Sequence, residues 1–108
     1  AISSNDIRKY PADRPEKMAD FAMENRFDFP YLYDADQKVA KKFNASVTPD
    51  FFLFDSSDKL FYHGQLDDSR PGNGISISGS DLRNAIDGLI YNRSFSEIQK
   101  PSTGCTIE

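Results

Sequence analysis

The 108-residue sequence has only one cysteine, Cys105, and one histidine, His63. A single thiol excludes a disulfide bond within the chain and is typical of proteins from a reducing compartment. We therefore expect the cytoplasm, an assignment that a targeting segment upstream of Ala1 would overturn. The sequence has neither a Cys/His cluster nor the glycine and glutamate spacing of a calcium loop, so it predicts no metal site and no cofactor.

Long apolar stretches and dense basic patches are also missing. No window approaches the roughly 18 consecutive apolar residues of a membrane helix. The net charge is −4, whereas nucleic acids and anionic lipids bind dense Lys/Arg patches, so we expect neither as a partner. The sequence has no phosphate-binding glycine pattern, no Ser/His/Asp arrangement and no His-Glu-x-x-His motif. It therefore gives no support to a hydrolase or a nucleotide-binding protein.

The length suits one domain, which we place at residues 1–91, with an extended tail over residues 92–108 that shows no periodicity. Apolar residues at helical spacing and polar residues at cap positions predict three helices. They run from the cap Asp13 to about Asn25, from Ala35 to Phe43 after the cap Asp34, and from the cap Ser80 to near Tyr91.

Strand signals lie between these helices. Ile2 opens a short apolar segment, Phe29 to Tyr33 is briefly extended, and Phe51 to Phe54 with Leu60 to Leu66 predict an antiparallel hairpin across a polar turn. Thr48-Pro49 directly precedes this hairpin. Because proline has no backbone donor, it belongs at the entrance of a strand, one of the few places where a cis peptide bond occurs.

The order of helix, Thr-Pro step, strand, turn and strand resembles the C-terminal half of the thioredoxin fold. The more specific similarity is to the redoxin group, the alkyl hydroperoxide reductase and thiol-specific antioxidant (AhpC/TSA) proteins. This similarity lies in the segments Phe29–Asp34, Val39–Phe43 and Thr48–Asp55. Two further segments, Gly64–Asn73 and Lys100–Cys105, resemble one subgroup of these proteins. The resemblance implies a cis peptide bond at Thr48-Pro49, with these two residues holding an extended substrate strand beside the reactive sulfur.

The resemblance also implies a cysteine motif that this chain lacks. Family members carry Cys-x-x-Cys or Thr-x-x-Cys where an earlier strand meets a helix, and neither motif occurs here. We therefore expect an incomplete thioredoxin-like α/β fold, a central mixed sheet flanked by helices, with the first strands and the active-site helix missing. The unpaired edges left in such a sheet invite pairing. We expect the upstream module to fill this gap in the native protein. The alternatives are that a second chain fills it by strand exchange in a homodimer, or that the two flanking strands close on each other.

Two functions follow from this comparison. The first is a fragment of a thiol-disulfide oxidoreductase or peroxiredoxin-like antioxidant protein, inactive by itself, whose substrate or reductant is a thiol or disulfide protein. The alternative is a non-catalytic module that docks a peptide or partner protein on its cis-proline face. The sequence upstream of Ala1 decides between enzyme and module, so the chain alone leaves its status as an enzyme open.

Five further residues are weighed beside Thr48 and Pro49. Cys105 lies between small residues in a polar tail and is either a catalytic partner thiol or an incidental cysteine. Arg70 either serves a function in its loop or forms a salt bridge to Asp67 or Asp68 that fixes the loop. His63, alone in a strand, is more typical of a surface or half-buried residue than of a catalytic or metal-binding one.

Overall fold

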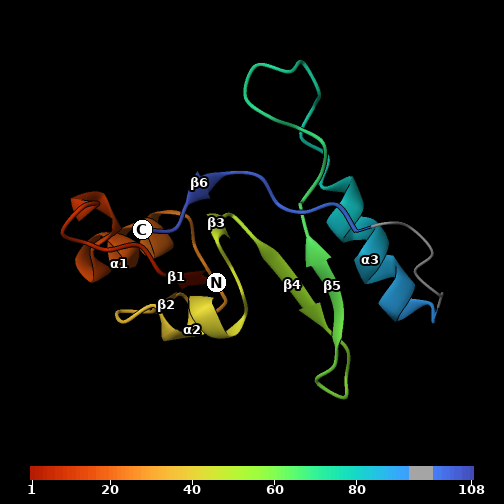
Figure 1. The fold of residues 1–108 in the computed structure, drawn as a ribbon, viewed down its shortest axis with the longest axis horizontal. Coiled ribbons are helices and arrows are strands. Elements are labelled where there is room, and N and C mark those ends of the chain that lie inside the picture. The colour runs from red at the N-terminus through yellow and green to blue at the C-terminus, as the bar shows by residue number, and fades with distance from the viewer. Residues whose placement is uncertain (93–98) are drawn as a thin grey trace. The chain divides into compact units, whose positions relative to one another are not determined.

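The computed structural model describes residues 1–92 and 99–108. The chain divides into two compact units, residues 1–46 with 106–108 (unit 1) and residues 47–105 (unit 2). Figure 1 labels the helices and short strands of both units. The domain limits at 91 and 92 stay a prediction. Residues 93–98 of the expected tail lie outside the described residues, and 99–108 form an extended segment that includes one short strand.

Unit 1 combines two short strands with two helices and a 3-10 turn. The strands β1 (Ile2–Ser3) and β2 (Leu32–Tyr33) pair in parallel. The helices are α1 (Pro15–Glu24) and α2 (Lys38–Lys42), and η1 (Pro11–Asp13) is the 3-10 turn. Helix α1 buries Met18. The ring of Phe27 stacks on Phe29 at 4.5 Å between centroids and meets Phe21 and Tyr31 edge to face.

The predicted caps of the first two helices need correction. Asp13 does not cap α1, because it ends the 3-10 turn and its carboxylate accepts a hydrogen bond from Asn5 at 3.0 Å. Helix α2 begins at Lys38, later than expected, because Gln37 before it is in the left-handed conformation. Asp34 nevertheless binds the first turn of α2, since its carboxylate accepts hydrogen bonds from the backbone N–H groups of Val39 and Ala40.

Unit 2 contains the predicted hairpin and the third helix. Strands β4 (Phe51–Phe54) and β5 (Leu60–Gly64) pair antiparallel, with a register irregularity between Leu53 and Phe54. The hairpin is confirmed, although β5 ends two residues earlier than expected. Helix α3 (Ser80–Ile90) packs on it (Figure 1), and the core contains Tyr62 of β5 and Ala85 of α3, which are 1% and 0% exposed.

The cap predicted for α3 is also wrong. Gly79, in the left-handed conformation, precedes the helix, and no cap side chain binds its first turn. The carbonyl oxygen of Leu66 instead accepts the backbone N–H groups of Asp81 and Leu82. Partners of this kind satisfy the free N–H groups at a helix start as well as a cap side chain does.

The described strands form three separate pairs: β1 with β2, β4 with β5, and β3 (Val47–Thr48) with β6 (Cys105–Thr106). The single central mixed sheet expected from the sequence is therefore not formed by the described residues, because no strand belongs to two pairs. One of the three alternatives, closure of the strand at Ile2 onto Phe51–Phe54, is not formed, since β1 pairs with β2 and β4 pairs with β5. The chain is a mixed α/β protein with short sheets.

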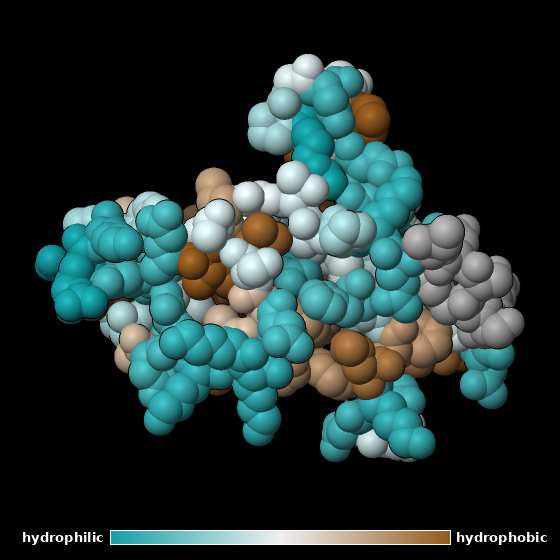
Figure 2. All heavy atoms as spheres, in the orientation of Figure 1, coloured by the Kyte–Doolittle hydropathy of each residue, from teal (hydrophilic) through white to brown (hydrophobic). Residues whose placement is uncertain are grey.

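Apolar side chains remain exposed on both units. Figure 2 shows hydrophobic residues (brown) beside the end of the hairpin and along α3, and the exposed ones on these elements are Phe54, Leu60, Ile86 and Ile90. No helix among the described residues is long and apolar enough to cross a membrane.

Candidate functional site

The Thr48–Pro49 peptide bond, which joins β3 to the start of β4, is cis in this structure. Both residues are exposed. The next residue, Asp50, is different, because only 8% of its side chain is exposed and its carboxylate is hydrogen-bonded. The candidate site is therefore an exposed Thr-Pro step followed by a buried carboxylate.

Asp50 connects the hairpin to the C-terminal segment. One carboxylate oxygen lies 2.9 Å from Nε2 of His63 in β5, and the other accepts a hydrogen bond from the hydroxyl of Ser102 at 2.6 Å. The ring of Phe52 stacks on the imidazole of His63 with centroids 4.1 Å apart. The order is Ser-Asp-His, with the carboxylate in the middle, so the imidazole does not contact the hydroxyl as it does in a serine hydrolase.

Residues 99–105, which we call the tail strand, run along the hairpin. The side-chain oxygen of Gln99 accepts the backbone N–H of His63 at 3.0 Å, and its amide group donates to the carbonyl of Phe61 at 3.3 Å. The backbone N–H of Gln65 donates to the carbonyl of Lys100 at 3.0 Å. The tail strand is thus hydrogen-bonded along one side of β5.

Two glycines permit the closest approaches of the tail strand. A Cβ atom on Gly64 would lie 2.4 Å from the carbonyl oxygen of Lys100, and one on Gly104 would lie 2.1 Å from the carbonyl oxygen of Thr48. Real Cβ atoms do not approach backbone so closely, so only glycine fits either position. Gly104 therefore places Cys105, which is exposed in β6, against the strand that leads into the cis-proline.

The loop candidates lie in a separate polar cluster after β5. The salt bridge from Arg70 to Asp67 or Asp68, one of the two alternatives from the sequence, is not formed. The guanidinium donates instead to the backbone carbonyls of Asp67 and Ser69 and to the side-chain oxygen of Gln65. The other end of the Gln65 amide donates to Asp68 and Asp81. The buried Gln65 side chain thus holds the loop.

Asp67 has a structural part in this cluster. Its buried carboxylate accepts the backbone N–H groups of Gly79, Ser78 and Ser69 at 2.7, 2.8 and 3.0 Å. These hydrogen bonds, that from Gly79 above all, hold the pKa of Asp67 below its ordinary value of 3.8. The hydrogen bond from Lys100, and then that from Gln65, lower the pKa of Asp68.

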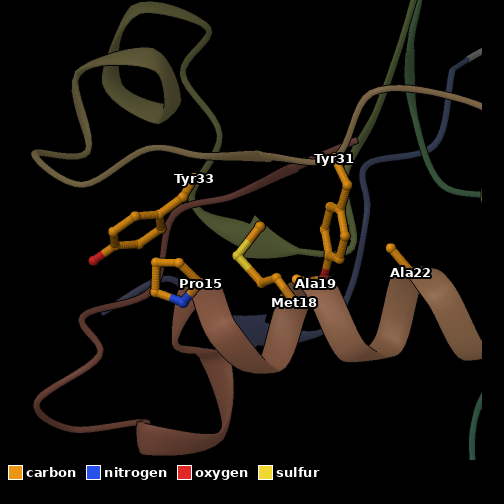
Figure 3. Close-up of a pocket in the computed structure, with 6 residues that line it drawn as sticks. All are labelled: Pro15, Met18, Ala19, Ala22, Tyr31 and Tyr33. Atoms are coloured by element: carbon orange, nitrogen blue, oxygen red, sulfur yellow. The ribbon is translucent and has the colours of Figure 1, made fainter.

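No metal centre marks a second site among the described residues. No group of three His, Cys, Asp or Glu side chains within residues 1–92 and 99–108 could hold a metal ion. Unit 1 has a small apolar pocket of about 160 Å³ between α1 and β2 (Figure 3), lined by Pro15, Met18, Ala19, Ala22, Tyr31 and Tyr33. This pocket contains no nucleophile and no charged group.

Sequence reasoning selected Thr48, Pro49 and Cys105, and the structure brings these three together through β3 and β6. It missed Asp50, Ser102 and Gly104. Asp50 and Ser102 are 52 residues apart in the chain, and no local pattern signals a contact over that distance. His63 is half-buried, with 35% of its side chain exposed, as its sequence context suggested.

Comparison with known proteins identifies the family of the chain. The model of the AhpC/TSA family matches residues 10–63, half of the chain. The chain belongs to the AhpC/TSA family. Membership implies a thioredoxin-like fold and confirms the resemblance seen in the sequence. The match includes the Thr48-Pro49 step and the hairpin as far as His63, whereas the tail strand lies outside it.

Two solved structures resemble the chain over nearly its full length. An uncharacterized conserved protein from Geobacillus kaustophilus is 53% identical over 100% of the chain, with a TM-score of 0.95. A hypothetical protein from Sinorhizobium meliloti 1021 is 46% identical over 99%, with a TM-score of 0.94. The chain spans only 57% and 58% of the lengths of these two proteins. No curated protein matches it.

Proposed function

We propose that the chain is the C-terminal part of a thiol-dependent redoxin, an oxidoreductase or peroxidase-like antioxidant protein. Its share of the site is the Thr48-Pro49 step and the thiol of Cys105. The observation that carries the proposal is the pairing of β3 with β6, which holds Cys105 against the strand entering the cis-proline. In this proposal the reactive cysteine belongs to a preceding module with the first strands and the active-site helix of the thioredoxin-like fold.

The role of Cys105 would be that of a partner thiol. In the peroxidase version, the upstream thiolate attacks a hydroperoxide, becomes a sulfenic acid and releases an alcohol or water. The thiol of Cys105 then condenses with the sulfenic acid, a disulfide forms and water leaves. A thiol or disulfide protein would restore the two thiols by exchange. A reducing compartment such as the cytoplasm suits this cycle.

The first test uses the chain itself. We expect negligible turnover in insulin reduction and in peroxide consumption, because one cysteine cannot form the dithiol through which this chemistry cycles. Turnover that the Cys105→Ser variant abolishes would contradict the proposal, since it would make Cys105 the catalytic residue of this chain.

The second test uses the gene upstream of the Ala1 codon and the protein that it encodes. A Cys-x-x-Cys or Thr-x-x-Cys motif there supports the redoxin. In that protein, mass mapping after peroxide treatment should then find a disulfide between the upstream cysteine and Cys105, which is lost in Cys105→Ser and kept in the neighbouring Thr103→Ala control. If the upstream motif is present but its disulfide does not include Cys105, the proposal of a redoxin stands and the proposed role of Cys105 as the partner thiol is wrong.

A non-catalytic binding module is the second candidate. The absence of any Cys-x-x-Cys or Thr-x-x-Cys motif in the 108 residues favours it. Such a module would dock a peptide on its cis-proline face, and an upstream sequence free of both motifs would support it over the enzyme.

A further inference from the structure

We propose that the tail strand occupies the backbone edge of Thr48 to which an extended protein substrate would bind, and so closes this edge to other polypeptides. The inference rests on the proposed function in one respect, the use of that edge for an extended strand. While the tail strand is docked, the site would accept a small oxidant such as a hydroperoxide, with Cys105 as its internal partner, and would exclude a protein chain.

The geometry at Thr48 carries the first step. In an extended strand the N–H and C=O groups of one residue point to the same side. The carbonyl oxygen of Thr48 packs directly against Gly104, so the side that carries both hydrogen-bonding groups of Thr48 faces the tail strand. Pro49 offers no N–H group. A substrate strand that needs the backbone of Thr48 therefore competes with residues 104–105 for the same place.

Contacts along β5 carry the second step. Gln99 binds the backbone of His63 and Phe61, and Lys100 accepts from Gln65. The hydroxyl of Ser102 lies within hydrogen-bonding distance of both the buried Asp50 carboxylate, at 2.6 Å, and the carbonyl of Gly64, at 2.7 Å. A segment fixed at several points and covalently attached has an effective concentration in the millimolar range. A free peptide at micromolar concentration should therefore not displace it.

Gly104→Ala tests the proposal on the full chain. The added Cβ cannot be accommodated 2.1 Å from the Thr48 carbonyl, so the tail strand must move away there. Thr103→Ala is the matched control, because the Thr103 side chain is exposed and neighbours the same position. The probe is a fluorescein-labelled synthetic peptide with the sequence of residues 100–108 and the Cys105→Ser change, used at roughly 100 μM, well below the effective concentration of the attached strand.

The expected result has two parts. In Gly104→Ala, hydrogen exchange of the His63 and Gln65 amides rises at least about tenfold, since their partners are in the tail strand. The same variant binds the peptide, whereas the unchanged protein and Thr103→Ala do not. Equal binding to all three proteins would overturn the proposal, and so would a released tail strand without peptide binding.

A second pair of variants tests the same proposal if the Gly104→Ala protein does not fold. Ser102→Ala removes the hydroxyl that joins the tail strand to Asp50, and Ser102→Thr restores a hydroxyl. We expect the peptide to bind to Ser102→Ala and not to Ser102→Thr. If it binds to neither variant, the proposal is wrong. Because the probe has no thiol, this experiment is independent of the redox assays. If the peptide binds to none of the variants although an upstream cysteine motif is found, the proposal that the tail strand closes the Thr48 edge is wrong. The redoxin proposal would then stand.

Discussion

Asp34 and Asp67 are two buried carboxylates that bind backbone instead of cations. Asp34 accepts N–H groups of Val39 and Ala40 in α2 together with the hydroxyl of Ser4. Burial acts to raise the pKa of Asp34, yet the hydrogen bonds from Ala40, Ser4 and Val39 outweigh it and hold the pKa below 3.8. At both residues the fold therefore favours the ionised form, so each contributes stability above the ordinary pKa of a carboxyl group.

Asp67→Asn should lower stability at neutral pH, because an amide offers one acceptor oxygen where the carboxylate uses both oxygens for three N–H groups. The folded pKa lies below 3.8, so the contribution of Asp67 is complete above that value and is lost as the pH falls through the lower, folded value. Urea midpoints of the two proteins should accordingly differ at neutral pH and approach each other as the pH falls below the ordinary pKa of 3.8.

The control for this prediction is Asp58→Asn, an exposed turn carboxylate in the same unit. Its urea midpoint should stay close to that of the unchanged protein at every pH. A difference between Asp67→Asn and the unchanged protein that grows on acidification would contradict the assignment.

Among the elements, the hairpin with α3 is the best packed part of unit 2. Tyr62 in β5 is 1% exposed, and its hydroxyl donates to the backbone carbonyl of Gln65. The ring supports the hairpin, while the hydroxyl fixes the chain where it leaves β5 for the loop of Asp67 and Arg70. The hairpin therefore positions both the tail strand and the polar cluster around Gln65.

Tyr62→Ala should cost about 3–5 kcal/mol of unfolding free energy, because it leaves a cavity the size of a large ring. Tyr62→Phe should cost only about 1 kcal/mol, since it removes one hydrogen bond and keeps the ring. Chemical denaturation measures both. Leu60→Ala on the same strand is the control, because Leu60 is 54% exposed, and equal losses at the two positions would show that the ring is not a core residue.

At the scale of the whole molecule, the described strands leave unpaired edges and exposed apolar residues. Ile2 and Leu32, directly opposite each other in the β1–β2 pair, are 49% and 54% exposed. We propose that the isolated chain forms a homodimer through this open edge, in keeping with the tendency of short unprotected sheets to pair.

Sedimentation of the chain over a range of concentrations should then show reversible self-association. Leu32→Lys should weaken it by at least about tenfold, because the interface loses a large apolar side chain and gains a charge. Ile77→Lys is the control, since Ile77 is 81% exposed in a connecting segment outside any strand. A chain that stays monomeric at all concentrations, or equal effects of the two variants, would contradict the proposal.

Local patterns predicted the regular elements well. The apolar runs and the polar turn between them predicted the hairpin of residues 51–54 and 60–64, and the apolar stripe predicted the helix over residues 80–90. The caps were predicted poorly. Asp34 was predicted correctly as the residue that binds the first turn of α2. Asp13 does not cap α1, because it belongs to a 3-10 turn, and Ser80 does not cap α3, because the carbonyl of Leu66 accepts the N–H groups at the start of that helix.

The sequence by itself was enough to predict the helices and the hairpin, the family, and the place of the Thr48-Pro49 step at the entrance of a strand. Each of these depends on residues that are neighbours along the chain. Only the tertiary structure decided that Ser102 meets Asp50 and that Gly104 lies against Thr48. These contacts depend on where the chain returns after many residues. A glycine or serine in an extended segment shows no sign of its distant partner until the backbone brings the two together.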